Sequence, residues 1–457
     1  MKKQLLLLAL SAIVAVSSLT GCGSKETGKS GVTEVVIWTG DSHSKAVMNE
    51  LVNKFNNGEG KQKGINIKYE VKEGSVGQSL DIALQNGKGP DLIGAGKMAE
   101  YSEKGYITPL EEVPELADFL DKYSDTRVEG WNVYKGKTYF VPVGSQLFGL
   151  AINKDLFKKA GIVDEKGEAK APETFDEMVE DAKKLTDESK QQYGVVFPVK
   201  WSGFFGCEIQ NVASASGGGF GYDFTKGQYD YNQLKPVMDA IMQMKEDGSA
   251  YPGAEGLDND PARARFAEGN IGMKFSVSWD VGVWNDQFPT KCDWDIYPIP
   301  VADRDKAYYQ EKNPVWSMMF NKKSLEEKDA DKIVTVYKWL YSDETLTEMY
   351  KQGVQLPWRY DLVKDVKLKD AKIGWESYAK LLEISVPHKT AAKSDVSAYD
   401  SISTAFVNDV WSGKKSVDTF IKEQNAHYND GIKKYISVNE GYEPPVDKEY
   451  SMLRSGK

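Results

Sequence analysis

Strand patterns and helix patterns alternate over the first hundred residues of the chain, and this alternation restricts the fold more than any other feature. Residues 33–40 are a short apolar, β-rich run, residues 45–56 carry apolar side chains at spacings of three and four, and residues 64–71 alternate as a strand. A further helix pattern, a Gly-Pro break and a buried strand at residues 91–95 follow. This order is typical of an α/β fold with a parallel sheet.

The same alternation recurs in the middle of the chain. Residues 147–162 indicate a buried strand followed by an amphipathic helix that ends at Gly161. Thr174 is a helix N-cap with Glu177 three residues later, which is the spacing of a capping box. The other expected elements are strands at 193–199 and 270–277, a hairpin at 219–232, helices at 233–246 and 261–268, and an almost wholly helical tail from Ala330. Two α/β units and a helical tail predict two lobes.

The composition agrees with a globular body and excludes some functions. Hydrophobic residues make up 40% of the chain and charged residues 28%, and the formal net charge of −10 argues against a nucleic-acid partner. The three histidines, His43, His388 and His427, are far apart and share no metal-binding spacing, so we expect neither a zinc site nor another cofactor. Whether Cys207 and Cys292 form a disulfide is left open by the sequence.

The N-terminus has the features of a targeting signal. A positively charged start precedes an apolar run at residues 5–16, which is too short to span a bilayer but suits a signal peptide. Residues 19–22, Leu-Thr-Gly-Cys, resemble the lipobox of bacterial lipoproteins. The resemblance implies a signal peptide at 1–21 and a diacylglycerol, with fatty acids such as palmitate, on Cys22. The polar stretch 22–31 is then a flexible tether to the outer face of the cell membrane.

Short motifs along nearly the whole chain carry a second resemblance. They are residues 141–162 (VPVGSQLFGLAINKDLFKKAGI), 171–178 (APETFDEM), 262–279 (ARARFAEGNIGMKFSVSW), 297–300 (YPIP), 339–344 (WLYSDE), 356–359 (LPWR) and 412–421 (SGKKSVDTFI). In number and order they resemble the extracellular solute-binding proteins of ABC sugar importers, family 1, the group that includes the maltose-binding protein. The chain is identified as a member of this family from these motifs together.

The resemblance implies a definite architecture. The fold is expected to be α/β, a two-lobe periplasmic-binding-protein-like fold with a cleft between the lobes and a helical C-terminal tail. The chain is expected to cross between the lobes near residues 139–144, 292–298 and 340–343, which then act as the hinge. The implied division is residues 32–141 plus 295–340 for lobe one, and residues 142–294 plus 341–457 for lobe two.

The resemblance also implies a function. The protein is expected to be a lipid-anchored, monomeric receptor that binds a saccharide, in particular an oligosaccharide, by hinge closure and delivers it unchanged to an ABC permease. Two alternatives stay open: a surface-anchored glycosidase with paired carboxylates, and a binding protein for a non-sugar solute such as a peptide or a phosphorylated polyol. No nucleophile elbow or phosphate-binding loop favours an enzyme. The identity and length of the sugar are open.

Several candidate ligand residues follow the strands of the first α/β unit. Ligands of parallel sheets bind beyond the carboxyl ends of the strands, which are here residues 39–44 and 94–98. Asp41 and His43 follow the first strand, where the family has a hydroxyl-binding loop, and Lys97 follows the third. A solvated loop charge is the alternative interpretation of Asp41.

Other candidates belong to the second half of the fold. Aromatic rings stack on the C–H faces of sugars, and planar polar groups bind the hydroxyls. Trp279, with Asp280 after it, matches the family position of a stacking tryptophan, and Trp201 ends another strand; a core tryptophan is the alternative for both. Gln146 stands where the maltose-binding protein has a ligand-binding carboxylate, which argues against maltose itself. The tail adds two candidates, Tyr399 and Asp400.

Overall fold

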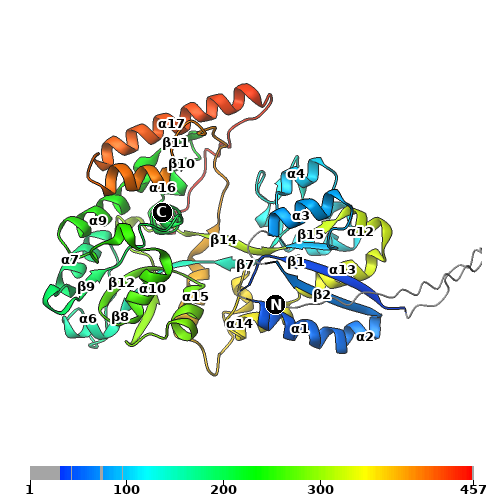
Figure 1. The fold of residues 1–457 in the computed structure, drawn as a ribbon, viewed down its shortest axis with the longest axis horizontal. Helices are drawn as coiled ribbons and strands as arrows, with labels where there is room; N and C mark the ends of the chain where they lie inside the picture. Colours follow the sequence, from blue (N-terminus) through cyan, green and yellow to red (C-terminus); the bar gives the residue numbers. More distant parts are fainter. Residues whose placement is uncertain (1–30, 43, 73–75, 95, 455–457) are drawn as a thin grey trace, which may run out of the picture.

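The structure is a computed structural model that describes residues 31–42, 44–72, 76–94 and 96–454. The expectations for the signal peptide, for Cys22 and for His43 concern residues outside these ranges. Figure 1 shows two bodies joined at a waist, each built on a sheet with helices around it. We call them the first lobe and the second lobe and define each by its sheet below. Within the described ranges, no helix has the length and apolar character of a membrane span.

The first lobe is built on a five-stranded sheet of order β2-β1-β3-β15-β4. Strand β1 pairs in parallel with β2 and β3, and β15 runs antiparallel to β3 and β4. The strands are β1 (Thr33–Thr39), β2 (Ile65–Val71), β3 (Leu92–Gly94), β4 (Ile107–Thr108) and β15 (Met319–Asn321). The expected strands at 33–40 and 64–71 and their parallel pairing are therefore confirmed. Strand β15 is distant in the sequence and joins this sheet after the chain has passed through the second lobe.

Alternating side chains of β1 contribute to two apolar clusters, one on each face of the sheet. Val35 and Ile37 pack with α1 and α13 in one apolar cluster, whereas Trp38 packs on the opposite cluster with α3 and α4. A sheet covered on both faces in this way is the usual setting of parallel strands. The helices of the lobe are α1 (Lys45–Asn57), α2 (Glu59–Lys63), α3 (Val76–Gln85), α4 (Met98–Glu103), α5 (Ala117–Asp121), α12 (Lys322–Glu327) and α13 (Ala330–Leu340).

The second lobe is built on a four-stranded sheet of order β13-β8-β12-β9. Strand β12 pairs antiparallel with β8 and parallel with β9, and β13 pairs antiparallel with β8. Every residue of β8 and β12 is buried, as expected for central strands that helices cover on both faces. The strands are β8 (Phe148–Asn153), β9 (Tyr193–Val195), β12 (Ile271–Val277) and β13 (Trp294–Tyr297), and β10 (Tyr222–Asp223) and β11 (Gln228–Tyr229) form the expected hairpin.

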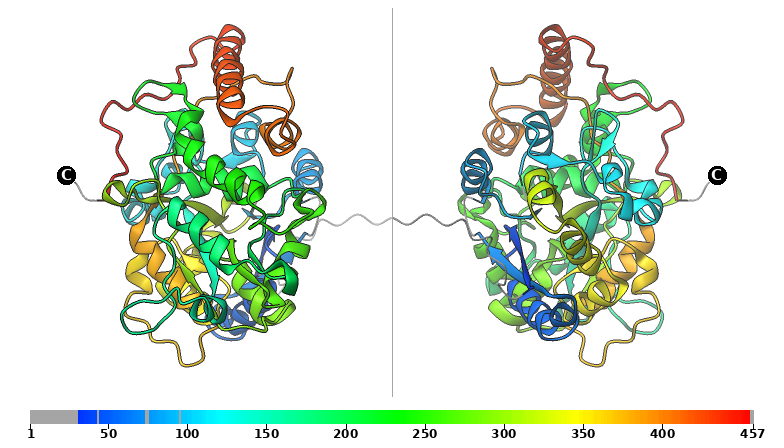
Figure 2. Two further views of the ribbon diagram at one scale, coloured as in Figure 1. Left: turned by 90° about the vertical axis from the view of Figure 1, so that its left-hand side faces the viewer. Right: turned by 90° about the vertical axis from the view of Figure 1, so that its right-hand side faces the viewer.

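Helices surround this sheet and continue into the tail. Thr174 caps α7 as expected: its hydroxyl accepts a hydrogen bond from the Glu177 backbone N–H at 3.2 Å, and the Glu177 carboxylate accepts one from the N–H of Glu173 at 2.7 Å. The longest helix, α17, lies at the upper edge of the molecule in both side views (Figure 2). The helices are α6 (Lys154–Lys159), α7 (Phe175–Leu185), α8 (Asn211–Ser214), α9 (Lys235–Glu246), α10 (Asn259–Ala267), α11 (Asp280–Gly282), α15 (Trp375–Leu381), α16 (Ile402–Ala405) and α17 (Val417–Val438).

A third sheet joins the lobes. Its order is β16-β7-β14-β17, and its two longest strands, β7 (Pro142–Gln146) and β14 (Gln310–Ser317), run antiparallel through the waist in Figure 1. The short strands are β16 (Leu356–Pro357) and β17 (Ser385–Pro387). The expected crossing at 139–144 coincides with the entry into β7. The one expected at 292–298 is wrong, because β13 pairs with β8 inside the second lobe and β14 makes the return.

The tail departs from the expectation in two ways. Helix α14 (Asp343–Lys351) places Leu346 and Met349 in the first-lobe core, so the chain leaves that lobe after α14 and not at residues 340–343. The tail is also not almost wholly helical, because residues 363–374 and 388–401 form no helix or strand. Pro387 ends β17, and Gly374, whose φ is +84°, directly precedes α15. The expected lobe boundaries at residues 294–295 and 340–341 move with these two crossings, whereas the boundary at residues 141–142 remains a prediction.

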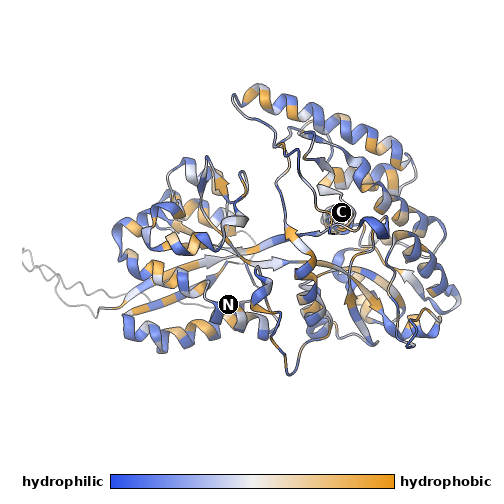
Figure 3. Cartoon of the chain, turned by 180° about the vertical axis from the view of Figure 1, so that it is seen from behind, coloured by the Kyte–Doolittle hydropathy of each residue, from blue (hydrophilic) through white to orange (hydrophobic). Residues whose placement is uncertain are grey.

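Hydrophilic residues are prominent on the outer helices (Figure 3), and both cysteines of the folded body are free thiols. Hydrophilic and hydrophobic residues alternate along α17, and hydrophilic residues cover much of the outer helices (Figure 3). Cys207 and Cys292 are free thiols, so no disulfide joins them. Burial raises the pKa of both thiols to about 12, which keeps them protonated and unreactive at neutral pH.

Candidate ligand-binding cavity between the lobes

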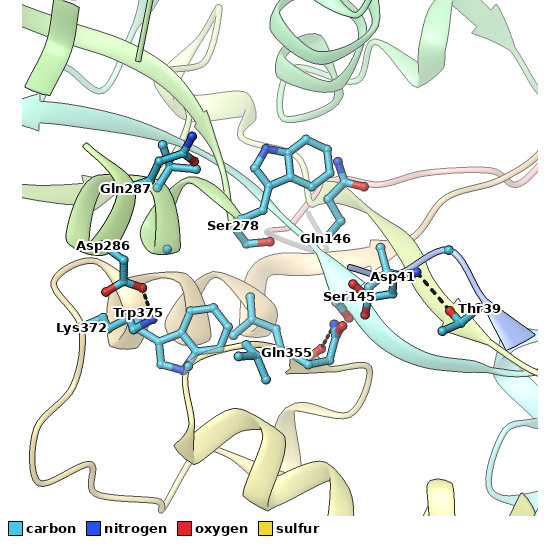
Figure 4. Close-up of a pocket in the computed structure, with 18 of the residues that line it drawn as sticks. Thr39, Asp41, Ser145, Gln146, Ser278, Asp286, Gln287, Gln355, Lys372 and Trp375 are labelled. Carbon is cyan, nitrogen blue, oxygen red and sulfur yellow. Dashed lines mark hydrogen bonds and ion pairs between the residues drawn. The ribbon is translucent and has the colours of Figure 1, made fainter. Parts of the chain in front are cut away.

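A cavity of about 530 Å³ lies where the two lobes meet the connecting sheet. Its volume is in the range of sites for small organic ligands. Figure 4 shows its lining side chains pointing toward a common space from several elements. The lining residues are Thr39, Gly40, Asp41 and Gly94 of the first lobe, Ser145, Gln146, Val315 and Gly353–Leu356 around the connecting sheet, and Ser278, Trp279, Gly282, Val283, Asp286, Gln287, Lys372 and Trp375 of the second lobe.

The first lobe contributes the carboxyl end of β1. The chain turns there, and the backbone N–H of Asp41 donates to the Thr39 hydroxyl at 3.1 Å, a contact drawn in Figure 4. The Asp41 carboxylate accepts from the hydroxyl of Ser44 at 2.6 Å and from its backbone N–H at 3.3 Å, just before α1 begins. These bonds orient a half-buried carboxylate at the strand end, where the parallel sheet predicts a ligand.

The connecting sheet contributes amide side chains. Gln146 ends β7, its backbone pairs with that of Asn313 on β14, and its half-buried side chain lines the cavity. Gln355 is only 6% exposed, and its Nε2 donates to the carbonyl oxygen of Leu356 at 2.9 Å. Amide groups carry both donors and acceptors, as hydroxyl groups require of a partner.

The second lobe contributes two tryptophans. Trp279 follows β12, is half-buried and packs against the large apolar core of the lobe, and its Nε1 is buried with no hydrogen-bond partner in the described part of the chain. Trp375 begins α15, is 3% exposed, and its Nε1 donates to the carbonyl oxygen of Tyr350 at 2.8 Å. Two indole rings therefore wall the cavity from one lobe.

Polar side chains complete the second-lobe side. Asp286 and Gln287 come from a π-helical turn, Val283–Gln287, a local distortion that is frequent at functional sites. Asp286 forms an ion pair of 2.6 Å with Lys372, which Figure 4 shows at the side of Trp375. Among the lining residues that the structure describes, Lys372 is the single cation, and this pair neutralises it.

The structure brings three of the sequence candidates into the cavity: Trp279, Asp41 and Gln146. Asp280 adjoins Trp279 but is 2% exposed, and its carboxylate is occupied by the Arg263 guanidinium at 2.8 Å and by the backbone N–H of Val277 at 3.0 Å. The Asp280 carboxylate is therefore part of the lobe interior and does not line the cavity.

Four further candidates lie away from the cavity. Trp201 lines a separate internal cavity of about 10 Å³ beside the buried Glu208. Lys97 pairs with Asp81 at 3.1 Å on the first lobe. Tyr399 is 40% exposed and stacks on the ring of His427 at 3.8 Å, and Asp400 follows it on the surface. These four side chains are not placed to contact a ligand in the cavity as the lobes now stand.

The sequence reasoning missed most of the second-lobe wall. Thr39 falls in the strand-end range 39–44 that the sequence predicts. Ser278 adjoins Trp279, so strand-end position could have identified it. Lys372 lies in an irregular segment with no periodic pattern and Trp375 follows it, and no local signal marks either residue. The missed lining side chains with polar or aromatic groups are Ser145, Ser278, Asp286, Gln287, Gln355, Lys372 and Trp375.

The site offers hydrogen bonding and aromatic stacking. Among the described residues, no group of three or more His, Cys, Asp or Glu side chains is arranged to hold a metal ion. A mixed apolar and polar cavity at the junction of two α/β lobes defines a protein that binds a small molecule.

Comparison with known proteins gives the family. Residues 39–346 match the family described as bacterial extracellular solute-binding protein, and the chain belongs to this family. It is 25% identical over 248 residues to the maltotriose-binding protein of Pyrococcus abyssi, covering 54% of this chain and 49% of that protein. It is 30% identical over 185 residues to the sn-glycerol-3-phosphate-binding periplasmic protein UgpB of Brucella suis, covering 38% and 41%. The chain spans about half the length of the curated relatives it matches.

Solved structures confirm the two-lobe fold. The apo-form of RafE from Streptococcus pneumoniae superposes with a TM-score of 0.67 at 17% identity, covering 89% of this chain and 100% of that one. The maltose/maltodextrin-binding domain MalE from Bdellovibrio bacteriovorus, bound to maltotriose, gives 0.61 at 18% identity, with the same coverage of 89% and 100%. The expected α/β, two-lobe periplasmic-binding-protein-like fold is therefore correct.

Proposed function

We propose that the protein is a receptor that binds a neutral oligosaccharide in the cavity between its lobes and delivers it to an ABC permease. The observation that carries this proposal is the division of the cavity lining. In the second lobe Trp279 offers a half-buried ring and Trp375 adds an almost fully buried apolar wall, while Asp41 of the first lobe and Gln146 of the connecting sheet offer hydrogen bonds. A ligand held from both sides favours closure, because it interacts more strongly with the closed state.

The charge of the lining favours a neutral ligand. A phosphorylated polyol requires an unpaired cation or a cluster of N–H donors. Lys372 is the one cation in the described part of the lining, and Asp286 lies 2.6 Å from it. Two relatives with 25% and 30% sequence identity to this chain are named for maltotriose and for sn-glycerol 3-phosphate, respectively. Sequence similarity alone therefore does not decide between the two classes of ligand. Because Lys372 is already paired with Asp286, the lining favours a neutral saccharide over a phosphorylated ligand.

The same proposal includes the location of the protein. The lipobox-like residues before Cys22 support a signal peptide at 1–21, lipidation of Cys22, and attachment to the outer face of the cell membrane. A receptor tethered there stays beside its permease. We propose that it acts as a monomer and returns its ligand chemically unchanged, since the family is one of solute-binding receptors.

A thermal-shift screen tests the binding function. The protein is heated with maltotriose, raffinose and other neutral saccharides, and separately with sn-glycerol 3-phosphate. A ligand at a hundredfold its dissociation constant adds about 2.7 kcal/mol to the stability. We expect a neutral saccharide to raise the melting temperature and chromatography to recover it intact. A shift with the phosphate alone, or a hydrolysed sugar, would overturn the proposal.

A further inference from the structure

A chain of buried hydrogen bonds lies directly behind the tryptophan wall of the cavity. One oxygen of Asp280 accepts from the Val277 backbone N–H at 3.0 Å and from the Ser276 hydroxyl at 3.2 Å. Its other oxygen accepts from Nε of Arg263 on α10 at 2.8 Å. The carboxylate thus closes the short turn from Val277 to Asp280, and Trp279 lies within this turn.

The chain continues to the helix that carries the second tryptophan. The Tyr378 hydroxyl donates to the Ser276 hydroxyl at 2.7 Å. Tyr378 lies on α15, which begins at Trp375, so the two residues are one helical turn apart. The bond therefore fixes α15 against the end of β12. We call Arg263, Asp280, Ser276 and Tyr378 the buried brace.

Three of the four brace residues are buried inside the lobe, and the Arg263 side chain is 11% exposed. Ser276 and Asp280 are 2% exposed, and Tyr378 is 0% exposed. Burial raises the pKa of the Tyr378 hydroxyl well above its ordinary value, so the group stays protonated and keeps its donor role. Polar groups at such depth cost free energy unless they are paired, and an apolar core of the same shape is often as stable. A satisfied network does give one defined arrangement of the elements it joins.

We propose that Asp280, Ser276 and Tyr378 are positioning residues that hold Trp279 and Trp375 in one fixed relative geometry before ligand arrives. The brace joins the two elements that carry these rings, through a single serine hydroxyl. Rings that are already ordered lose less conformational freedom on binding, which increases affinity. This inference rests on the proposed saccharide function for its ligand, whereas the fixed geometry is a property of the free protein.

The first arm of the test measures ligand affinity. Tyr378→Phe removes the brace hydroxyl and keeps the ring. Tyr222→Phe is the matched control, because Tyr222 is 1% exposed and its hydroxyl donates to the Pro445 carbonyl at 2.9 Å, away from the cavity lining. By calorimetry with the saccharide that stabilises the wild type, we expect Tyr378→Phe to raise the Kd about tenfold and Tyr222→Phe to leave it unchanged.

The second arm needs no ligand. The protein is labelled with 5-fluorotryptophan, and the ¹⁹F resonances of Trp279 and Trp375 are assigned by changing each to Phe. We expect Tyr378→Phe to shift or broaden both resonances and Tyr222→Phe to alter neither. Ser276→Ala, which removes the hydroxyl shared by both branches, repeats the experiment from the centre of the brace and should give the same result.

The outcomes separate the two claims. A lower melting temperature with unchanged Kd and unchanged resonances would reduce the brace to a structural role and overturn the inference, and so would a change at Trp375 alone. If no saccharide binds the wild type, the proposed function fails, and the fluorine spectra of the free protein still decide whether the brace positions the two rings.

Discussion

Gln355 lies so close over Gly144 that a Cβ atom at residue 144 would stand 2.0 Å from the Gln355 side-chain nitrogen. Gly144 lies on β7, and Gln355 directly precedes the neighbouring strand β16, in which Pro357 pairs with Gly144 and Leu356 with Ser145. The missing side chain at residue 144 therefore lets Gln355 reach the cavity lining. A polar contact of the candidate site depends on a glycine of the waist.

Gly144→Ala should accordingly disturb both stability and binding. The methyl group collides with a 6% exposed side chain, so we expect a loss of about 1–3 kcal/mol of unfolding free energy, the range for overpacking, and weaker saccharide binding. Gly77→Ala on α3 is the control, since no atom lies within 4 Å of its added Cβ, and it should not destabilise. Urea unfolding measures both variants. Equal stability of the two would show that Gln355 moves aside freely.

Trp279→Ala should lower affinity and also stability. Loss of a stacking ring is expected to weaken binding by about 1–3 kcal/mol. The ring is half-buried against the core, so we further expect about 1–2 kcal/mol less unfolding free energy without ligand. Trp201→Ala is the control: Trp201 lines a different cavity and should lose stability alone. Calorimetric titration and unliganded melts distinguish the two; a Kd that rises only for Trp201→Ala would reverse the assignment.

Glu208 should give the stability a pH dependence near neutrality. Burial raises its pKa from 4.5 to about 7, although the Lys274 ammonium lies 2.8 Å from one carboxylate oxygen. The folded state thus keeps a proton that the unfolded state releases. The stabilisation is fully present below pH 4.5 and is lost as the pH rises through about 7, with a slope of up to about 1.4 kcal/mol per pH unit.

Urea unfolding from pH 4.5 to 8 tests this dependence. Glu208→Gln cannot titrate at this position, so its profile should lack the decline that the wild type shows in this window. Glu344→Gln, whose parent side chain is 82% exposed, should keep the wild-type profile. Parallel curves for the wild type and Glu208→Gln would contradict the assignment of the proton to Glu208.

Cys22→Ser should abolish membrane anchoring. Only a thiol accepts the diacylglycerol in the lipoprotein route, so the variant should stay unlabelled by a radioactive fatty acid and keep its signal peptide. Cys207→Ser, which changes a free thiol of the folded body, should be labelled like the wild type. Labelling of the Cys22 variant would show that the anchor lies elsewhere.

Local patterns in the sequence predicted the framework of each lobe well. The strand at 33–40, the helix at 45–56 and the Thr174 cap depend on contacts between near neighbours, and the structure confirms all three. Pairing between distant segments was harder. Strand β13 could have continued toward the first lobe, and only its pairing with β8 keeps it in the second.

In the candidate site, too, local position was predictable from the sequence and contacts between distant segments were not. Asp41 and Trp279 follow strands and were predicted from that position. Asp280 follows a strand as well, but Arg263, which turns it inward, is distant in the sequence. Trp375 reaches the cavity only because α15 packs on β8 and β13. The residues around Trp375 in the sequence show no pattern from which this packing could be predicted.

The central claim is that one ligand is held from both lobes, and calorimetric titration of two single variants tests it most directly. Asp41→Ala changes the first lobe, and Gln287→Ala changes an exposed lining side chain of the second. With the saccharide that stabilises the wild type, we predict that each variant raises the Kd about threefold to tenfold, the effect of losing one hydrogen bond. A ligand that binds both variants as tightly as the wild type would contradict a site between the lobes.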